Sequence, residues 1–270
     1  MLVSGLSQTP PFFTSPDSSL FLGDSLNLLE EIKKGTIDMI FADPPYFLSN
    51  GGITCHSGRM VSVNKADWDK IDSFEAKHSF NRKWIGLCRE ILSPKGTIWI
   101  SGTLHNIYSI GVALEQEGFV ILNNITWQKT NPPPNLACRC FTHSTETIIW
   151  ACKAENKSKH YFDYQRMKDE NGGKQMKDVW VGTLTPPCEK YEGKHPTQKP
   201  LYILKRIIEA STKEGDLILD PFCGSSTTGV AAMLLGRRYI GMDNELEYLE
   251  LSKRRLMSCL NLPHETSKLV

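Results

Sequence analysis

The sequence has almost no net charge and no long hydrophobic run. Its 31 Lys+Arg residues against 30 Asp+Glu residues give a formal net charge of +1, which argues against a chain-wide basic surface built to grip a polyanion. No apolar run approaches the roughly 18–20 residues that a membrane-spanning helix needs. Residues 1–5 lack the basic start and apolar stretch of a signal peptide. We therefore expect a cytoplasmic protein that does not bind membranes.

The cysteines also lack a pattern. Eight of them are spread over the 270 residues, unlike the dense frameworks of small secreted domains, so we expect reduced thiols. Cys138, Cys140 and His143 lie close in sequence, but a structural zinc site needs four ligands and no further ligands are evident. The sequence therefore predicts no metal site.

The apolar residues, 40% of the chain, alternate between strand-like and helix-like periods. This pattern predicts an α/β fold with a parallel sheet covered on both faces. Residues 47–70 are rich in Gly and Ser and are predicted as a long loop. Strands are predicted at 20–22, 37–42, 97–101, 119–128, 144–152, 217–219 and 239–242, and helices at 26–35, 80–92, 104–117, 201–212, 225–235 and 244–259.

Residues 220–229 (DPFCGSSTTG) follow a predicted strand and open a helix. Small residues in such a turn let a ligand approach the free N–H groups at the start of the helix. Asp243 lies 23 positions after Asp220, the spacing at which a carboxylate meets ribose hydroxyls in a nucleotide-binding unit. An ordinary tight turn is the alternative. The glycine spacing matches neither the dinucleotide nor the P-loop motif, which disfavours both of those functions.

A second motif, Asp43-Pro44-Pro45-Tyr46, ends a predicted strand. In open α/β sheets ligands bind at this edge. The two prolines fix the backbone and remove two N–H donors, leaving carbonyls that accept. A carboxylate, a carbonyl and an aromatic ring suit a flat group that carries an amine. A plain Pro-Pro turn is the less favoured alternative.

Together with residues 195–200 (HPTQKP), these two motifs resemble the signature of bacterial DNA amino-methyltransferases over residues 20–258. Their order, with the catalytic segment first, is similar to the beta group of N6-adenine methyltransferases. Residues 43–70 resemble modification enzymes that methylate GATC in restriction-modification systems. The resemblance implies a Rossmann-like fold, with a seven-stranded, mostly parallel sheet, a circularly permuted motif order and an inserted target-recognition region.

The resemblance also implies the domain organisation and the partners. Residues 1–19 would be an N-terminal extension, 20–152 the catalytic half, 153–194 the target-recognition insertion, 195–259 the cofactor-binding half and 260–270 a frayed tail. The partner would be DNA, duplex or single-stranded. A homodimer and a companion restriction endonuclease are further candidates.

The implied cofactor is S-adenosylmethionine. The predicted cofactor set is Asp24 and Ser25 at the adenine ring, Asp243 at the ribose, Thr197 and Lys199 at the carboxylate, Asp220, Phe222 and Gly224 at the methionine end, and Asp43, Cys223, Ser225 and Thr227 beside them. Ser226 departs from the family, whose members often have Gly there, and Phe47 stands where Asn often follows the tyrosine. Neither departure removes a group that the chemistry needs.

For catalysis, the resemblance implies that Asp43 and the Pro44 carbonyl hold the target amine, that Pro45 completes the rigid motif and that Tyr46 stacks on the flipped base. Asp at position 43 favours adenine, since Ser is common in enzymes that methylate cytosine N4. N4-cytosine methylation is the closest alternative, and an RNA methyltransferase or a non-catalytic DNA-binding subunit are others. Cys223 belongs to the cofactor turn and is not expected to be a nucleophile.

The basic residues that would contact DNA are concentrated in one segment. Residues 129–194 hold eleven Lys+Arg against eight Asp+Glu, a local excess of three positive charges. We assign this segment and the 47–70 loop to target recognition. The predicted DNA contacts are Lys129, Arg139, Lys174 and Lys177.

Overall fold

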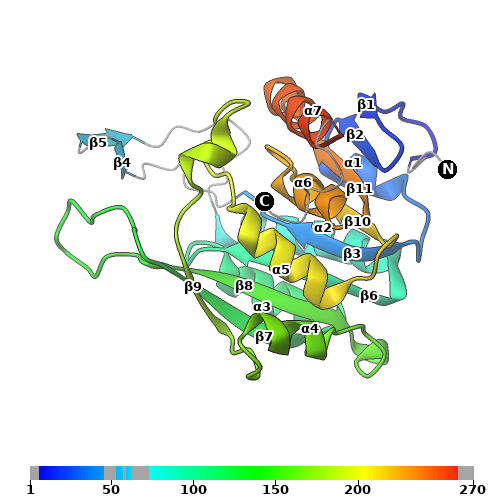
Figure 1. Cartoon of the computed structure of the whole chain (residues 1–270), viewed down its shortest axis with the longest axis horizontal. Coiled ribbons are helices and arrows are strands. Elements are labelled where there is room, and N and C mark those ends of the chain that lie inside the picture. Colours follow the sequence, from blue (N-terminus) through cyan, green and yellow to red (C-terminus); the bar gives the residue numbers. More distant parts are fainter. Residues whose placement is uncertain (1–5, 46–52, 57–58, 63–72, 261–270) are drawn as a thin grey trace.

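The computed structural model describes residues 6–45, 53–56, 59–62 and 73–260 (Figure 1). Its centre is one nine-stranded sheet in the order β1-β2-β11-β10-β3-β6-β8-β7-β9. The strands are β1 (Phe13–Thr14), β2 (Ser18–Leu22), β3 (Ile37–Ala42), β6 (Leu92–Gly102), β7 (Phe119–Lys129), β8 (Thr145–Lys153), β9 (Val179–Gly182), β10 (Leu217–Asp220) and β11 (Arg238–Asp243). Five of its eight strand pairings are parallel, so the expected mostly parallel sheet is confirmed.

The predicted number of seven strands is wrong. All seven predicted strands are present, but β1 and β9 extend the sheet at its two edges. These strands have only two and four residues, too few to show a period in the sequence. They form because an existing neighbour, β2 or β7, supplies the hydrogen-bonding edge.

Helices cover both faces of the sheet. Alternate residues of β3 show why: Ile40 and Ala42 pack with α1, α2 and α3, whereas Met39 and Phe41 pack with α5, α6 and α7. Both faces are therefore apolar, as the continuous hydrophobic runs of the strands predict. The helices are α1 (Ser25–Glu30), α2 (Phe74–Ile91), α3 (Ile107–Gln116), α4 (Tyr164–Glu170), α5 (Leu201–Ser211), α6 (Thr227–Leu234) and α7 (Leu246–Leu260).

Two segments contain more structure than the sequence predicts. Residues 47–70, predicted as a loop, include an antiparallel hairpin of β4 (Ile53–His56) and β5 (Arg59–Ser62). Residues 153–194 include α4 and β9, and within them Met167 and Trp180 are buried. Short elements in polar surroundings have little hydrophobic pattern of their own, which is why the sequence does not reveal them. Among the described helices, none is long and apolar enough to span a membrane.

Strand direction gathers the motifs at one edge. β2, β11, β10, β3 and β6 run parallel to one another, so their carboxyl ends meet at a common edge of the sheet. From β10 the chain continues to β11 on one side, whereas β3 and β6 lie on the other. This arrangement is a topological switch point, the place where open α/β sheets bind ligands. The two strands that flank the switch point are β3 and β10. Asp43 directly follows β3, and Asp220 is the last residue of β10.

Candidate active site

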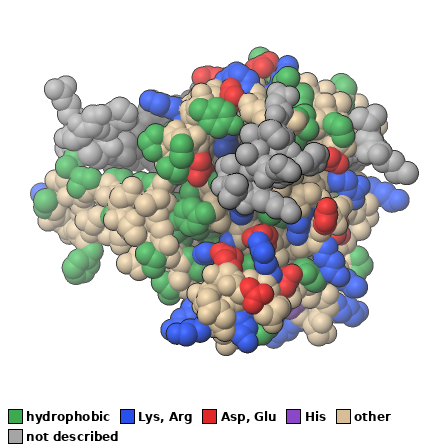
Figure 2. All heavy atoms as spheres, in the orientation of Figure 1, with side chains coloured by type: hydrophobic (Ala, Val, Ile, Leu, Met, Phe, Trp, Pro, Cys, Tyr) green, Lys and Arg blue, Asp and Glu red, His purple; other side chains and the backbone are tan. Residues whose placement is uncertain are grey.

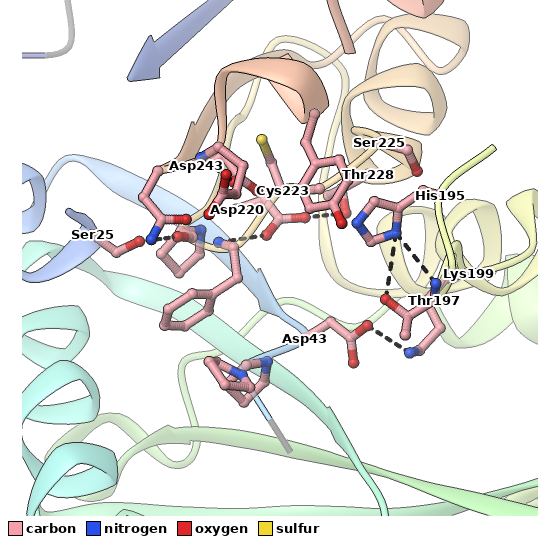
Figure 3. A pocket seen from close by; sticks show the side chains of 18 of the residues that line it. Ser25, Asp43, His195, Thr197, Lys199, Asp220, Cys223, Ser225, Thr228 and Asp243 are labelled. Atoms are coloured by element: carbon pink, nitrogen blue, oxygen red, sulfur yellow. Dashed lines mark hydrogen bonds and ion pairs between the residues drawn. The ribbon is translucent and has the colours of Figure 1, made fainter. Parts of the chain in front are cut away.

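A cavity of about 420 Å³ opens at this edge of the sheet (Figure 3). Its size lies within the range of small-molecule and cofactor pockets. Every described residue of the predicted catalytic and cofactor sets lines it: Asp24, Ser25, Asp43, Pro44, Pro45, Thr197, Lys199, Asp220, Phe222, Cys223, Gly224, Ser225, Thr227 and Asp243. Tyr46 and Phe47 lie outside the described residues. The structure therefore brings together segments that are more than 200 positions apart in sequence, such as those of Asp24 and Asp243.

Asp220 is the most buried carboxylate of the cavity, with only 3% of its surface exposed. Its Oδ2 accepts a hydrogen bond from the Thr228 hydroxyl at 2.6 Å, and its Oδ1 accepts one from the Phe222 N–H at 3.1 Å. Burial raises the pKa of Asp220 to about 7, against the lowering effect of these two bonds. The carboxyl group therefore changes its protonation state near neutral pH.

The turn after Asp220 requires unusual backbone conformations. Gly224 has a φ of +51°, and a Cβ added there would lie 3.0 Å from Nε2 of His195. Ser226 also has a φ of +51°, in the left-handed region that side chains disfavour. The left-handed backbone explains why a glycine would suit position 226. Ser226 is fully buried there, and its hydroxyl lies 3.2 Å from the Tyr239 hydroxyl, within hydrogen-bond distance.

Asp243, at the end of β11, holds the same turn from the other side. Its Oδ2 accepts a hydrogen bond from the Gly224 N–H at 2.8 Å, and its Oδ1 accepts one from the Glu245 N–H at 2.9 Å. Burial raises the pKa of Asp243 above its usual value. The same desolvation raises the pKa of the neighbouring Cys223 thiol well above its ordinary range. Cys223 is therefore a neutral thiol at physiological pH, which fits its expected lack of a nucleophilic role.

The start of α1 forms the third wall. Asp24 is the N-cap of this helix, and its Oδ1 accepts a hydrogen bond from the Asn27 N–H at 3.2 Å. The Ser25 hydroxyl donates a hydrogen bond to the Pro221 carbonyl. This bond joins α1 to the turn between β10 and α6, the two segments that are predicted to bind the ends of the cofactor.

Asp43 lies directly after β3 and faces the segment that leads into α5. Its Oδ2 forms an ion pair with the Lys199 ammonium at 2.6 Å (Figure 3). The Pro45 carbonyl accepts a hydrogen bond from Asn106 Nδ2 at 3.0 Å, and Asn106 is in turn held by Asn81 at 2.8 Å. These contacts anchor the motif at Asp43 and at Pro45. The contact of Lys199 with a cofactor carboxylate stays a prediction.

His195 and Thr197 complete the wall opposite Asp43. The Thr197 N–H donates to Nδ1 of His195 at 3.3 Å, and the imidazole packs edge-on against Tyr248 with ring centroids 4.3 Å apart. These contacts hold the imidazole in place at the wall of the cavity. The following residues also line the cavity but stand outside the predicted catalytic and cofactor sets: Leu26, Phe41, Phe80, Pro196, Gln198, Pro221, Thr228, Asn244, Glu245 and Tyr248. Pro196, Gln198, Pro221 and Thr228 belong to the predicted motifs, and for most of the others the only signal in the sequence is that they lie near a motif residue.

The predicted DNA contacts lie outside the cavity. Arg139, Lys174 and Lys177 are exposed. Lys129 is only 11% exposed, and its ammonium lies 2.6 Å from Glu146 Oε1. In the face of the molecule shown in Figure 2, basic and acidic side chains are intermixed rather than separated into a basic surface. The roles of these four residues at DNA stay predictions.

Comparison with known proteins identifies the family. A DNA methylase family model of the N6/N4 type matches residues 37–254. The chain is 65% identical to Type II methyltransferase M2.LlaDCHI of Lactococcus lactis subsp. cremoris, over 93% of this chain and 94% of that protein. It is 64% identical to Type II methyltransferase M2.DpnII of Streptococcus pneumoniae, over 93% and 94%, and 53% identical to Type II methyltransferase M2.MboI of Moraxella bovis, over 91% and 90%.

Two solved structures share the fold. The M1.HpyAVI–SAM complex has a TM-score of 0.67 and 28% identity, over 91% of this chain and 100% of that one. The PvuII DNA methyltransferase, described as cytosine-N4-specific, has a TM-score of 0.74 over 97% and 93%, and its 20% identity shows the fold alone. With the family match and the curated relatives, these findings establish that the chain belongs to the N6/N4 DNA methylase family and is a type II DNA methyltransferase.

Proposed function

We propose that the chain transfers a methyl group from S-adenosylmethionine to the exocyclic amine of an adenine flipped out of DNA, within GATC, and so protects DNA in a restriction-modification system. The observation that carries this proposal is the shared cavity. Asp43, from the motif that binds an amine, and Asp220, from the cofactor turn, line the same space of about 420 Å³. A donor and an acceptor of a methyl group bound there would be in contact.

The cavity fits the proposed cofactor chemically. Among the described residues that line it, five carry a carboxyl group and one, Lys199, carries an ammonium group. Carboxylates stabilise a sulfonium cation and accept hydrogen bonds from hydroxyl and amino groups. Gly224 leaves room beside His195 that a Cβ would fill, so the backbone can approach a ligand closely. When bound, S-adenosylmethionine supplies an electrophilic methyl group.

Asp43 and Pro44 supply the activation. An exocyclic amine is a poor nucleophile because its lone pair is delocalised into the ring. Two acceptors, the Asp43 carboxylate and the Pro44 carbonyl, would polarise both N–H bonds and stabilise the positive charge that develops on nitrogen. Positioning accounts for much of the rate enhancement, since no covalent intermediate is needed. Flipping the base costs a few kcal/mol, and stacking on Tyr46 would return about 1–3 kcal/mol.

The fold does not distinguish adenine from cytosine, because a cytosine-N4-specific enzyme shares it. The choice of adenine therefore rests on Asp43. Incubation with labelled cofactor and unmodified DNA, followed by mass spectrometry of the nucleosides, tests it. N6-methyladenine in GATC duplexes and not in scrambled duplexes supports the proposal. N4-methylcytosine, or label only in RNA, contradicts it. The same assay with single-stranded GATC oligonucleotides determines the strand preference.

Substitution of Asp43 tests the mechanism. Asp43→Ala is expected to abolish methyl transfer while cofactor binding, measured by calorimetry, is retained, because the carboxylate acts on the target amine. The matched control is Asp17→Ala, which removes an exposed carboxylate that does not line the cavity. Turnover near the wild-type level in Asp43→Ala would refute the assigned role.

We further propose that the motif order is circularly permuted and that target recognition uses residues 153–194 with the segment that contains β4 and β5. Support comes from Lys174 and Lys177, which are exposed within residues 153–194, and from Arg139, which is exposed in the connection between β7 and β8. In Figure 1 the β4–β5 hairpin and the connection between β7 and β8 project from the same side of the molecule. The GATC assignment rests on the resemblance of residues 43–70 to GATC-methylating enzymes, and 65% identity to M2.LlaDCHI is consistent with a shared target.

A further inference from the structure

Four charged side chains of alternating sign form a line behind the catalytic motif. The Asp43 carboxylate lies 2.6 Å from the Lys199 ammonium, which lies 3.5 Å from Glu146 Oε2. Glu146 Oε1 lies 2.6 Å from the ammonium of Lys129. All four side chains are 9–15% exposed. Asp43 and Lys199 line the cavity, whereas Glu146 and Lys129 do not.

The sheet brings these residues together. β8 is antiparallel to β6, so it begins at the edge where β3 and β6 end. β7 is antiparallel to β8 and therefore ends at this edge, with Trp127 directly opposite Glu146. Lys129 lies two residues beyond Trp127 on the same face, and its ammonium is 5.4 Å from the centre of that ring. Glu146 and Lys129 are thus fixed by a strand pair.

Burying four charged side chains costs free energy, so their presence here needs an explanation. Buried ion pairs lose hydration, and apolar residues of similar size are often equally stabilising. Burial alone would raise the pKa of Glu146, but the ammonium groups of Lys199 and Lys129 outweigh it and hold this pKa below its usual value. Glu146 is therefore an anion at neutral pH, directed at the lysine that pairs with Asp43.

We propose that Glu146 is a positioning residue for methyl transfer: it shares the Lys199 ammonium with Asp43 and so fixes the carboxylate that receives the target amine. Lys129 neutralises the far side of Glu146. This inference rests on the proposed function, because it assigns Asp43 to the amine. Without the Glu146 charge, the Lys199 ammonium would be attracted more strongly to Asp43, and Asp43 would be a poorer and differently oriented acceptor for the substrate.

The test compares Glu146→Gln with the double variant Glu146→Gln/Lys129→Met. The single variant leaves a buried Lys129 without its carboxylate, so a loss of stability is expected in any case. The double variant removes that unpaired charge and is expected to recover the unfolding midpoint. Its kcat is measured at saturating DNA, so that loss of the predicted DNA contact of Lys129 affects KM and not kcat. This kcat is nevertheless expected to stay roughly 10- to 100-fold below wild type, the scale of a misplaced catalytic group, with an unchanged cofactor Kd. Glu146→Asp is expected to recover part of kcat.

Three results would overturn the inference: recovery of kcat together with stability in the double variant, a wild-type kcat in Glu146→Gln, or a loss confined to cofactor Kd. The control is Glu155→Gln, which breaks an exposed ion pair of 2.8 Å with Arg89 just beyond the other end of β8. The proposed function is judged separately, by the nucleoside that the wild-type protein methylates. The inference is judged by the ratio of variant to wild-type rates on that substrate.

Discussion

The protonation of Asp220 makes the free energy of unfolding of this protein fall as the pH rises through neutrality. In the folded state its pKa is raised to about 7 from the ordinary value of 3.8. The folded protein therefore binds a proton more tightly than the unfolded chain between these two values. The stability that this proton contributes is complete below about pH 4 and is lost as the pH rises through about 7.

The size of the effect follows from the pKa difference. A difference of about three pKa units at about 1.4 kcal/mol each corresponds to about 4 kcal/mol between pH 4 and pH 8. Asp220→Asn removes the titration and keeps the shape. Its Oδ1 can still accept the Phe222 N–H, and its amide can donate to the Thr228 hydroxyl, which reverses the bond of 2.6 Å.

Urea unfolding at a series of pH values measures this contribution. The free energy of unfolding of the wild type is expected to fall relative to Asp220→Asn by about 4 kcal/mol as the pH rises from 4 to 8. Thr228→Val, which removes a donor to the carboxylate, is expected to move the loss to higher pH. If the curves of the wild type and Asp220→Asn are parallel, Asp220 does not titrate in this range and the reasoning is wrong.

Two further predictions concern the backbone of the cofactor turn and the helix behind it. Ser226→Ala loses the hydrogen bond to Tyr239 but keeps the strained left-handed backbone, whereas Ser226→Gly loses the same bond and relieves the strain. Urea unfolding should show the Gly variant to be more stable than the Ala variant by about 1 kcal/mol. Equal stability of the two variants would contradict the presence of strain. Gly229→Ala is expected to lower the free energy of unfolding by about 1–3 kcal/mol, since its Cβ would lie 2.5 Å from the Tyr239 ring. Its control, Gly111→Ala in α3, meets only Ile149 at 3.9 Å and should be neutral or stabilising in the same thermal and urea unfolding measurements.

The elements that the sequence predicts well are those whose hydrophobic pattern is complete within one segment. β3 and β11 appear within one residue of their predicted limits because each is mostly apolar and is buried on both faces. α2 was predicted from residue 80 but begins at Phe74, after Ser73, whose hydroxyl accepts the Ala76 N–H. Its first turn is exposed, so it adds no periodic apolar residue, and the cap alone was not a sufficient signal.

The residues of the site also fall into two groups, those that belong to a motif and those whose contacts appear only in the tertiary structure. The motifs after β3 and β10 are predicted to lie together because both follow strands, and the carboxyl ends of parallel strands share one edge. The roles of individual residues, and the inclusion of Thr197 and Lys199, follow instead from the resemblance to the methyltransferase family. The ion pair of Asp43 with Lys199 joins residues 156 positions apart, and Glu146 carries no motif at all. Which charged groups meet behind the motif depends on strand register and helix packing. These are tertiary properties that one sequence does not display.

The charge of the cavity has a consequence for how DNA is bound. The carboxylates that line it, among them Asp24, Asp43 and Asp243, would repel the phosphates of a nucleic acid. The basic side chains predicted to meet the backbone, Arg139, Lys174 and Lys177, are instead exposed on the surface. With the phosphates held outside, a neutral base is the part of DNA that can enter without a large electrostatic cost. An acidic cavity in a chain with a net charge of +1 therefore favours a flipped base over an intact duplex, because only the flipped base separates the amine from the charged backbone.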